Sequence, residues 1–104
     1  MGKVYHKERL AGLDVAFTRL IEVWTEELIH SVQIYICECH QNSLDNRRMD
    51  AVPMFGGQPV LREEDENWPI AEVRYEVMAE IAERLGFVCG HRQEPRNSKH
   101  FELR

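Results

Sequence analysis

Apolar residues recur at spacings of three and four along the first 40 residues of the chain. This spacing places them on one face of an α-helix, and no proline interrupts it. The apolar positions are Leu10, Leu13, Phe17, Leu20, Ile21, Trp24, Leu28, Val32, Tyr35 and Cys39. We therefore predict one long amphipathic helix over about residues 8–40. Gly12 and Asp14 leave open a later start at Asp14, which could serve as the N-cap.

The length of this helix bears on assembly. A helix over residues 8–40 would be roughly 45 Å long, whereas a compact chain of this size has a diameter of about 33 Å. An apolar stripe that extends beyond the core has to be covered by another protein surface. We therefore expect a homodimer through this helix, or a partner protein docked on it, with Trp24, Leu28 and Tyr35 among the interface residues.

A second amphipathic helix is predicted over about residues 68–85. Pro69 suits the first turn of a helix, and Gly86 suits the position just after its end. The positions expected to face the core are Ile70, Val73, Val77, Met78, Ile81 and Leu85.

The segment between the helices contains a Gly56-Gly57 pair flanked by two short apolar runs. Such a pair favours a tight turn, but Pro53 and Pro59 each remove a backbone donor from the flanking runs. We predict a loop or a short hairpin here, with the runs as edge strands or irregular structure.

The carboxyl-terminal segment predicts a β-hairpin. Phe101 and Leu103 alternate with polar residues, and turn-forming residues precede them at 95–98. Two helices with these β-elements define an α+β fold, and the length of the chain suits a single small domain over residues 1–104.

The whole chain has a formal net charge of −5. Its acidic residues are concentrated in the segment that contains the second predicted helix. Residues 62–86 carry eight acidic and three basic side chains. Rows of exposed carboxylates are usually solvated surface, but they can also steer a basic partner. The carboxylates that we include in a predicted partner-binding surface are Glu63, Glu64, Glu66, Glu76, Glu80 and Glu83.

The basic side chains gather at the carboxyl end, where residues 87–104 carry four basic and two acidic side chains. A chain with a net charge of −5 has no general basic field for nucleic acid. An alternative function as a small nucleic-acid-associated protein would therefore depend on the hairpin residues Arg92, Arg96, Lys99 and Arg104.

Three cysteines, an odd number, argue against a closed disulfide framework. Cys37 and His40 are three residues apart, which suits one side of a helix, and Cys89 and His91 are two apart, which suits one side of a strand. These four could ligate zinc, but their spacing is not that of a known finger. We expect no cofactor or metal, and keep a zinc-stabilised fold as the alternative.

Nothing in the chain predicts an enzyme. A Cys37 nucleophile served by His40 would lack a group to orient the histidine. The chain also has no apolar stretch of membrane-spanning length and no secretory signal, so we expect a cytoplasmic protein without membrane contact. The sequence thus favours a non-catalytic protein-protein interaction module, either an accessory subunit or a small acidic inhibitor that docks on a larger complex.

Overall fold

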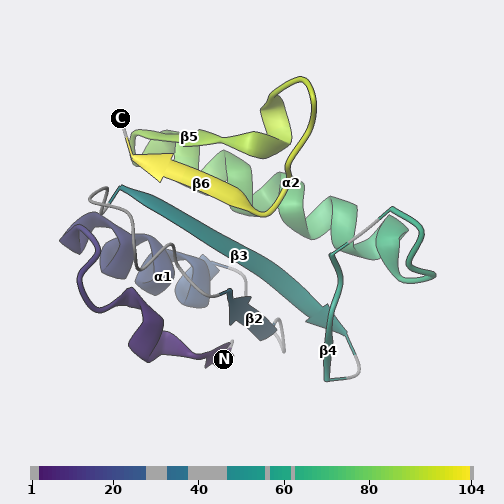
Figure 1. Ribbon diagram of the computed structural model, residues 1–104, viewed down its shortest axis with the longest axis horizontal. Helices are drawn as coiled ribbons and strands as arrows, with labels where there is room; N and C mark the ends of the chain where they lie inside the picture. Colours follow the sequence, from purple (N-terminus) through teal and green to yellow (C-terminus); the bar gives the residue numbers. More distant parts are fainter. Residues whose placement is uncertain (1–2, 28–32, 38–46, 56, 62, 104) are drawn as a thin grey trace.

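The computed structural model describes residues 3–27, 33–37, 47–55, 57–61 and 63–103. Within them the chain forms two α-helices, two 3-10 helices and a six-stranded sheet, which confirms the α+β class (Figure 1). The elements, in chain order, are β1 (Lys3–Tyr5), η1 (Lys7–Leu10), α1 (Val15–Glu27), β2 (Gln33–Ile36), β3 (Arg48–Phe55), β4 (Gln58–Pro59), α2 (Trp68–Arg84), β5 (Phe87–Cys89), η2 (Gly90–Arg92) and β6 (His100–Leu103).

The strands follow the order β1-β2-β3-β6-β5, and β4 pairs with β3 off this path. β1 and β2 are parallel, while the other pairs are antiparallel. Parallel neighbours need a crossover connection, and the segment between β1 and β2 contains α1. The first half of the chain is thus a β-α-β unit rather than a single helix.

The first helix is much shorter than the sequence predicts. α1 covers Val15–Glu27, about 20 Å at the usual rise per residue, and the chain is in a strand again at Gln33. The Asp14 side chain accepts a hydrogen bond from the Ala16 N–H at 2.9 Å, so it caps the helix start. The predicted helix over residues 8–40 is wrong, whereas the later start at Asp14 is confirmed.

The segment Gln33–Ile36, which lies within the predicted helix, has the burial period of a strand. In Gln33–Ile36 the buried Ile34 and Ile36 alternate with half-buried residues, and branched isoleucine suits a pleated strand. Tyr35 matched the helical stripe because short apolar runs fit both periods. Pairing with β1 and β3, which lie elsewhere in the sequence, gives this segment its conformation.

The apolar stripe of α1 faces the core of its own chain. Its buried members are Phe17, Leu20, Ile21 and Trp24. Trp24 is fully buried, and its indole N–H donates a hydrogen bond to the Met78 carbonyl of α2 at 3.1 Å. The homodimer was expected because the apolar stripe of this helix would be exposed. The described stripe of α1 is buried, so this reason for a homodimer no longer holds.

β3 is a central strand, although it contains Pro53. The Val60 N–H donates to the Pro53 carbonyl at 3.1 Å, but proline has no N–H to return the bond to the Val60 carbonyl. The Tyr75 hydroxyl of α2 donates to that carbonyl instead, at 2.9 Å. This bond supplies the donor that the proline removes. The pairing of Phe55 with Gln58 confirms a short hairpin at the Gly-Gly pair, but the prediction that both runs are edge or irregular structure is wrong for β3.

The second helix and the terminal hairpin agree with the sequence. α2 ends at Arg84, and Gly86 follows with a φ of 92°, which favours glycine. β5 and β6 pair with Cys89 opposite the buried Phe101. No helix in the described residues is long and apolar enough to cross a membrane.

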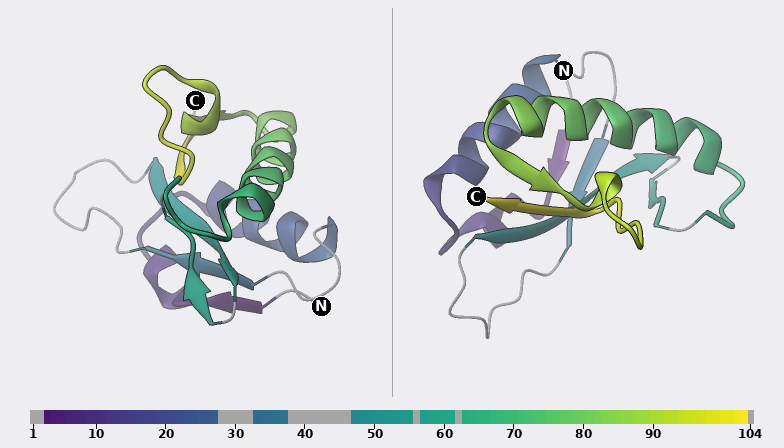
Figure 2. Two further views of the ribbon diagram at one scale, coloured as in Figure 1. Left: turned by 90° about the vertical axis from the view of Figure 1, so that its right-hand side faces the viewer. Right: turned by 90° about the horizontal axis from the view of Figure 1, so that it is seen from above.

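Both α-helices lie on the same side of the sheet (Figure 2). The larger core cluster joins them to β2, β3, β5 and β6. A smaller cluster, formed by Val52, Val60, Ala71 and Tyr75, lies at the amino-terminal half of α2. The part of α2 that precedes Tyr75 therefore has only a small core beneath it, and this is where side chains of the helix remain exposed.

Candidate interaction surface and adjoining pocket

α2 faces the core with three alanines and three larger side chains. Its buried residues are Ala71, Tyr75, Met78, Ala79, Ile81 and Ala82. Of the apolar positions predicted to be buried, Met78 and Ile81 are, but Ile70 and Val73 are 51% and 64% exposed. The predicted core positions of this helix did not include the alanines, because alanine is only weakly hydrophobic. Their helical spacing from Tyr75 nevertheless places them on the buried face. Two branched apolar side chains, three residues apart, therefore face outward at the start of the helix.

Carboxylates flank this apolar pair in the sequence. Glu63, Glu64 and Glu66 are exposed on the loop that precedes α2. Their neighbour Asp65 has a local role, since its side chain accepts a hydrogen bond from the Asn67 N–H at 2.8 Å. Glu80 is also exposed and lies seven residues after Val73, on the same side of the helix. We call Ile70, Val73 and Glu80, with the three loop glutamates, the α2 docking face.

A shallow hollow lies beside the acidic loop. It measures about 410 Å³ and is lined by Pro59, Leu61, Glu64 and Asp65. Leu61 is 47% exposed, so an apolar side chain borders the carboxylates here too. The hollow offers a place for a partner side chain at one end of the molecule.

The other two predicted glutamates of α2 contact the basic hairpin segment. Arg92 forms ion pairs with Glu76 and Glu83, and Arg96 lies 3.6 Å from Glu72. The hydrogen bond from Arg92 holds the pKa of Glu76 below its usual value, and the same bond raises the pKa of Arg92. The predicted acidic row and the predicted basic patch therefore neutralise each other in part. Arg104, also assigned to that patch, lies outside the described residues.

His91 connects the hairpin segment to α2 through hydrogen bonds of its side chain. Its Nε2–H donates to Glu76 at 3.1 Å, so in neutral imidazole the Nδ1 accepts from the Ser98 hydroxyl, 2.8 Å away. The ring also stacks on Tyr75, with centroids 6.1 Å apart. His91 and Ser98 are both buried. These contacts hold the Ser98 side chain in one place.

Close packing at Gly90 holds the same loop. The Asn97 N–H donates to the Gly90 carbonyl at 3.0 Å. A Cβ at Gly90 would lie 2.1 Å from the Asn97 carbonyl oxygen, so any other residue would push the loop away. The loop of residues 96–99 is thus bound to η2 by a backbone hydrogen bond, from Asn97 to Gly90, and by a side-chain hydrogen bond, between Ser98 and His91.

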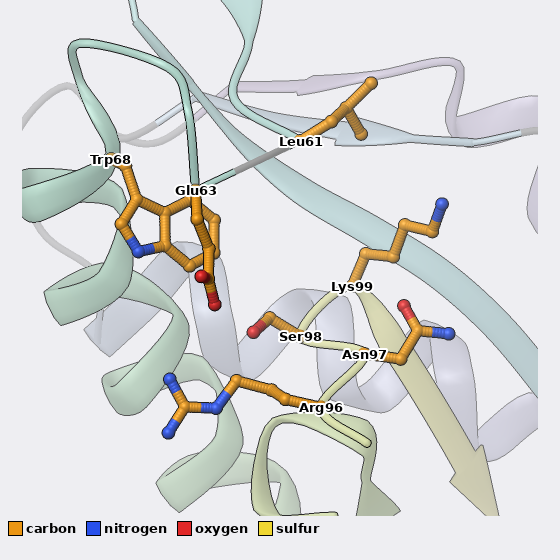
Figure 3. Close-up of a pocket in the computed structure, with 7 residues that line it drawn as sticks. All are labelled: Leu61, Glu63, Trp68, Arg96, Asn97, Ser98 and Lys99. Atoms are coloured by element: carbon orange, nitrogen blue, oxygen red, sulfur yellow. The ribbon is translucent and has the colours of Figure 1, made fainter. Parts of the chain in front are cut away.

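A pocket of about 120 Å³ lies between this loop and the segment before α2. Leu61, Glu63 and Trp68 form one side, and residues 96–99 form the other. Figure 3 shows the polar ends of Glu63, Arg96 and Ser98 directed toward a common space beside the Trp68 indole, while Lys99 points away. The pocket thus combines an aromatic wall with groups of both charges. The sequence does not reveal this pocket, because its two sides come from segments about 30 residues apart.

The interface residues predicted on the first helix do not form a surface. Trp24 belongs to the core, where its ring contacts Phe101 edge-on at 4.9 Å. Tyr35 is half-buried, and its hydroxyl accepts a hydrogen bond from Arg9 at 3.3 Å. Leu28 lies outside the described residues. Assigning Trp24 to an interface is therefore wrong, because the helix is short enough to bury its stripe within the domain.

The structure does not assemble the alternative zinc site from the ligands that it describes. The Cys89 thiol points to the Ala79 carbonyl at 3.5 Å, and burial raises its pKa to about 12. Cys37 packs against the smaller core cluster instead. His40 lies outside the described residues. Within the part of the chain that the structure describes, no group of three or more His, Cys, Asp and Glu residues is arranged to hold a metal ion.

Comparisons with known proteins add no assignment. A scan against protein-family models finds no match, and searches of curated proteins and of solved structures find none either. The function therefore has to be inferred from the chemistry of the described surface and pocket.

Proposed function

We propose that this protein is a non-catalytic interaction module that docks on a basic protein surface through the α2 docking face. The observation that carries the proposal is the exposure of Ile70 and Val73, 51% and 64%, directly after an acidic loop. Exposed branched apolar side chains supply the centre of an interface, and surrounding charges steer the partner. An accessory subunit or a small acidic inhibitor would both use such a face.

Charge supports a basic protein rather than nucleic acid as the partner. The loop glutamates and Glu80 give the face a negative sign, and the net charge of the chain is −5. Arg92 and Arg96, two of the four basic residues on which the nucleic-acid alternative depends, already contact α2 carboxylates. Contact with a phosphate backbone would have to break these pairs.

The test compares surface variants in affinity capture from the source organism. The variant I70D/V73D should lose the partner that the wild-type chain captures, by at least tenfold, because two charges would replace the apolar centre. Reversing Glu63, Glu64 and Glu66 to lysine should slow association, with an effect that shrinks at high salt. All variants should keep the wild-type melting temperature within a few degrees, since exposed substitutions change stability by only about 0.5 kcal/mol.

Val15→Asp provides a matched control, since Val15 is 78% exposed on α1, away from the docking face. This variant should capture the partner as the wild type does. If I70D/V73D captures the same partner with unchanged affinity, the docking face is wrong. If R96Q/K99Q abolishes a salt-sensitive association with RNA or DNA, the nucleic-acid function replaces it.

A further inference from the structure

Arg74 of α2 carries a charge that the fold does not balance. Its guanidinium lies over the Phe55 ring, 4.1 Å from the ring centroid, and burial lowers the pKa of Arg74 below its usual value. Within the part of the chain that the structure describes, no carboxylate forms an ion pair with it. A partly desolvated guanidinium that is already ordered on an aromatic ring is well placed to bind a carboxylate from another molecule.

The carboxylates that follow Ile70 on α2 are already neutralised in part. Glu72 lies 3.6 Å from Arg96, and Glu76 forms an ion pair with Arg92. Glu66 differs, because it is exposed on the loop before the helix and forms no ion pair with any of the described residues. The α2 docking face therefore lies between an unbalanced carboxylate and an unbalanced guanidinium.

The spacing of these charges makes the face complementary to itself. Ile70 comes four residues after Glu66 and four residues before Arg74. When two helices cross antiparallel about a two-fold axis at Ile70, a residue four positions before the centre faces the residue four positions after it in the other copy. Each Glu66 would then face the Arg74 of the other copy. Two ion pairs would flank an apolar centre formed by the exposed Ile70 and Val73.

The position of α2 in the molecule leaves room for such a crossing. The helix lies along the outer side of the molecule, and its amino-terminal half extends beyond β5 and β6 (Figure 2). Ile70 and Val73 belong to this half. Exposed apolar side chains with a polar border are typical of protein interfaces.

We propose that two copies of this chain associate through α2, antiparallel and centred on Ile70, with a Glu66–Arg74 ion pair on each side of the centre. Such a dimer covers the α2 docking face, so a partner protein has to displace the second copy before it can dock. This regulatory role rests on the proposed function, whereas the dimer itself can be measured on the purified protein alone.

The experiment is sedimentation of the purified full chain at concentrations up to about 1 mM. The wild type should show a reversible dimer. Arg74→Glu and Glu66→Arg should each raise the dissociation constant of the dimer by roughly tenfold or more, because each places like charges opposite one another at two symmetry-related positions. The double variant E66R/R74E exchanges the two charges and should restore the dissociation constant to within about threefold of the wild-type value.

Two further variants complete the design. Arg19→Glu is the matched control, because it changes the net charge as Arg74→Glu does but lies at an exposed position of α1. It should dimerise as the wild type does. Ile70→Asp should dissociate the dimer, since it places two charges at the apolar centre. Circular dichroism checks each fold, and Glu66→Arg, at an exposed loop position, tests the pairing without disturbing the contact between Arg74 and Phe55.

Three results would overturn the proposal. The first is a wild-type chain that remains monomeric over the whole concentration range. The second is a dimer that Ile70→Asp and Glu66→Arg leave intact, which would place the interface elsewhere. The third is a folded E66R/R74E variant that remains dissociated, which would show that these two residues do not face each other.

These outcomes can be told apart from a failure of the proposed function. A monomeric wild type whose captured partner is lost in I70D/V73D would leave docking intact and remove only the dimer. A dimer that I70D/V73D dissociates without any loss of the captured partner would have the opposite meaning.

Discussion

His91 is the residue through which the carboxyl-terminal loop and α2 are held together. Its two ring nitrogens bond Ser98 and Glu76, and its face covers Tyr75. A buried histidine with both nitrogens satisfied avoids the cost of an unpaired polar group. Its neighbour Tyr75 is likewise used at both ends, since its hydroxyl donates to the Val60 carbonyl beside Pro53. Tyr75 and Glu76 of α2 thus attach the segment that follows β4 and the hairpin loop, respectively.

Ser98, His91 and Glu76 are arranged in the order of a nucleophile, a base and a carboxylate. This arrangement allows the non-catalytic assignment to be tested. We expect that a fluorophosphonate probe does not modify Ser98. The residue is only 8% exposed, and the Glu76 carboxylate that would orient the base also pairs with Arg92. Intact mass after labelling measures this directly.

Ser98→Ala is the control for any background modification in that assay. An adduct mapped to Ser98 and absent in this variant would contradict the expectation. It would also place the protein among the hydrolases rather than among binding modules.

At the scale of elements, α2 presents three different faces. One packs on the sheet through alanines, Tyr75 and Met78. A second carries Glu76 and Glu83 against Arg92. The third is the α2 docking face. Only the first is fully used by the fold, which is why the third can serve a partner without affecting stability.

α1 differs, because its apolar face is used within the chain. We expect that Trp24→Asp unfolds the protein, since it would bury an unpaired charge and remove the indole hydrogen bond to the Met78 carbonyl. The loss should exceed about 4 kcal/mol, enough to abolish the cooperative melt followed by circular dichroism. Val15→Asp, at an exposed position of the same helix, should melt as the wild type does.

Sedimentation separates this outcome from an interface effect. If Trp24→Asp keeps its fold and only lowers the mass of a wild-type dimer, Trp24 contributes to a subunit interface. The core assignment would then be incomplete.

At the scale of the whole molecule, charges that are separated in the sequence meet in the structure. Arg92 comes from the basic end of the chain and lies between two carboxylates of the acidic helix. Such partly exposed pairs contribute little to stability individually. Their main effect is to neutralise part of the charge of Glu76 and Glu83.

This arrangement predicts a pH dependence. Arg92 holds the pKa of Glu76 below its usual 4.5, so the pair stabilises the fold above pH 4.5 and the contribution disappears as pH falls through the lowered value. Arg92→Gln should therefore lower the free energy of unfolding by about 0.5 kcal/mol at neutral pH, and the difference should vanish in strong acid. Urea titrations across that pH range measure it.

Arg19→Gln is the control, because Arg19 lies 3.9 Å from Glu22 at an exposed helical spacing and should change little at any pH. A destabilisation in Arg92→Gln that persists undiminished in strong acid would show that Arg92 acts through packing rather than charge.

The sequence could predict the elements whose signals are local. α2 begins at Trp68 with Pro69 in its first turn, because proline restricts the backbone to a helical φ. It ends at Arg84, shortly before Gly86, because glycine permits a positive φ. The alternation around Phe101 similarly predicted the terminal hairpin. The exposure of the acidic loop also followed from its composition. Each of these conclusions needs only neighbours within a few residues.

The remaining features depend on segments that are distant in the chain. β2 is a strand because β1 and β3 pair with it, not because of its own sequence, whose apolar spacing also fits a helix. The burial of Trp24 depends on α2 crossing above it, and the pocket depends on residues 96–99 facing Glu63 and Trp68. Periodicity determined that apolar faces exist, and composition determined that the acidic loop is exposed. Only the tertiary structure decided which apolar face is covered and which charges are left unpaired, because both depend on the partners that folding brings together.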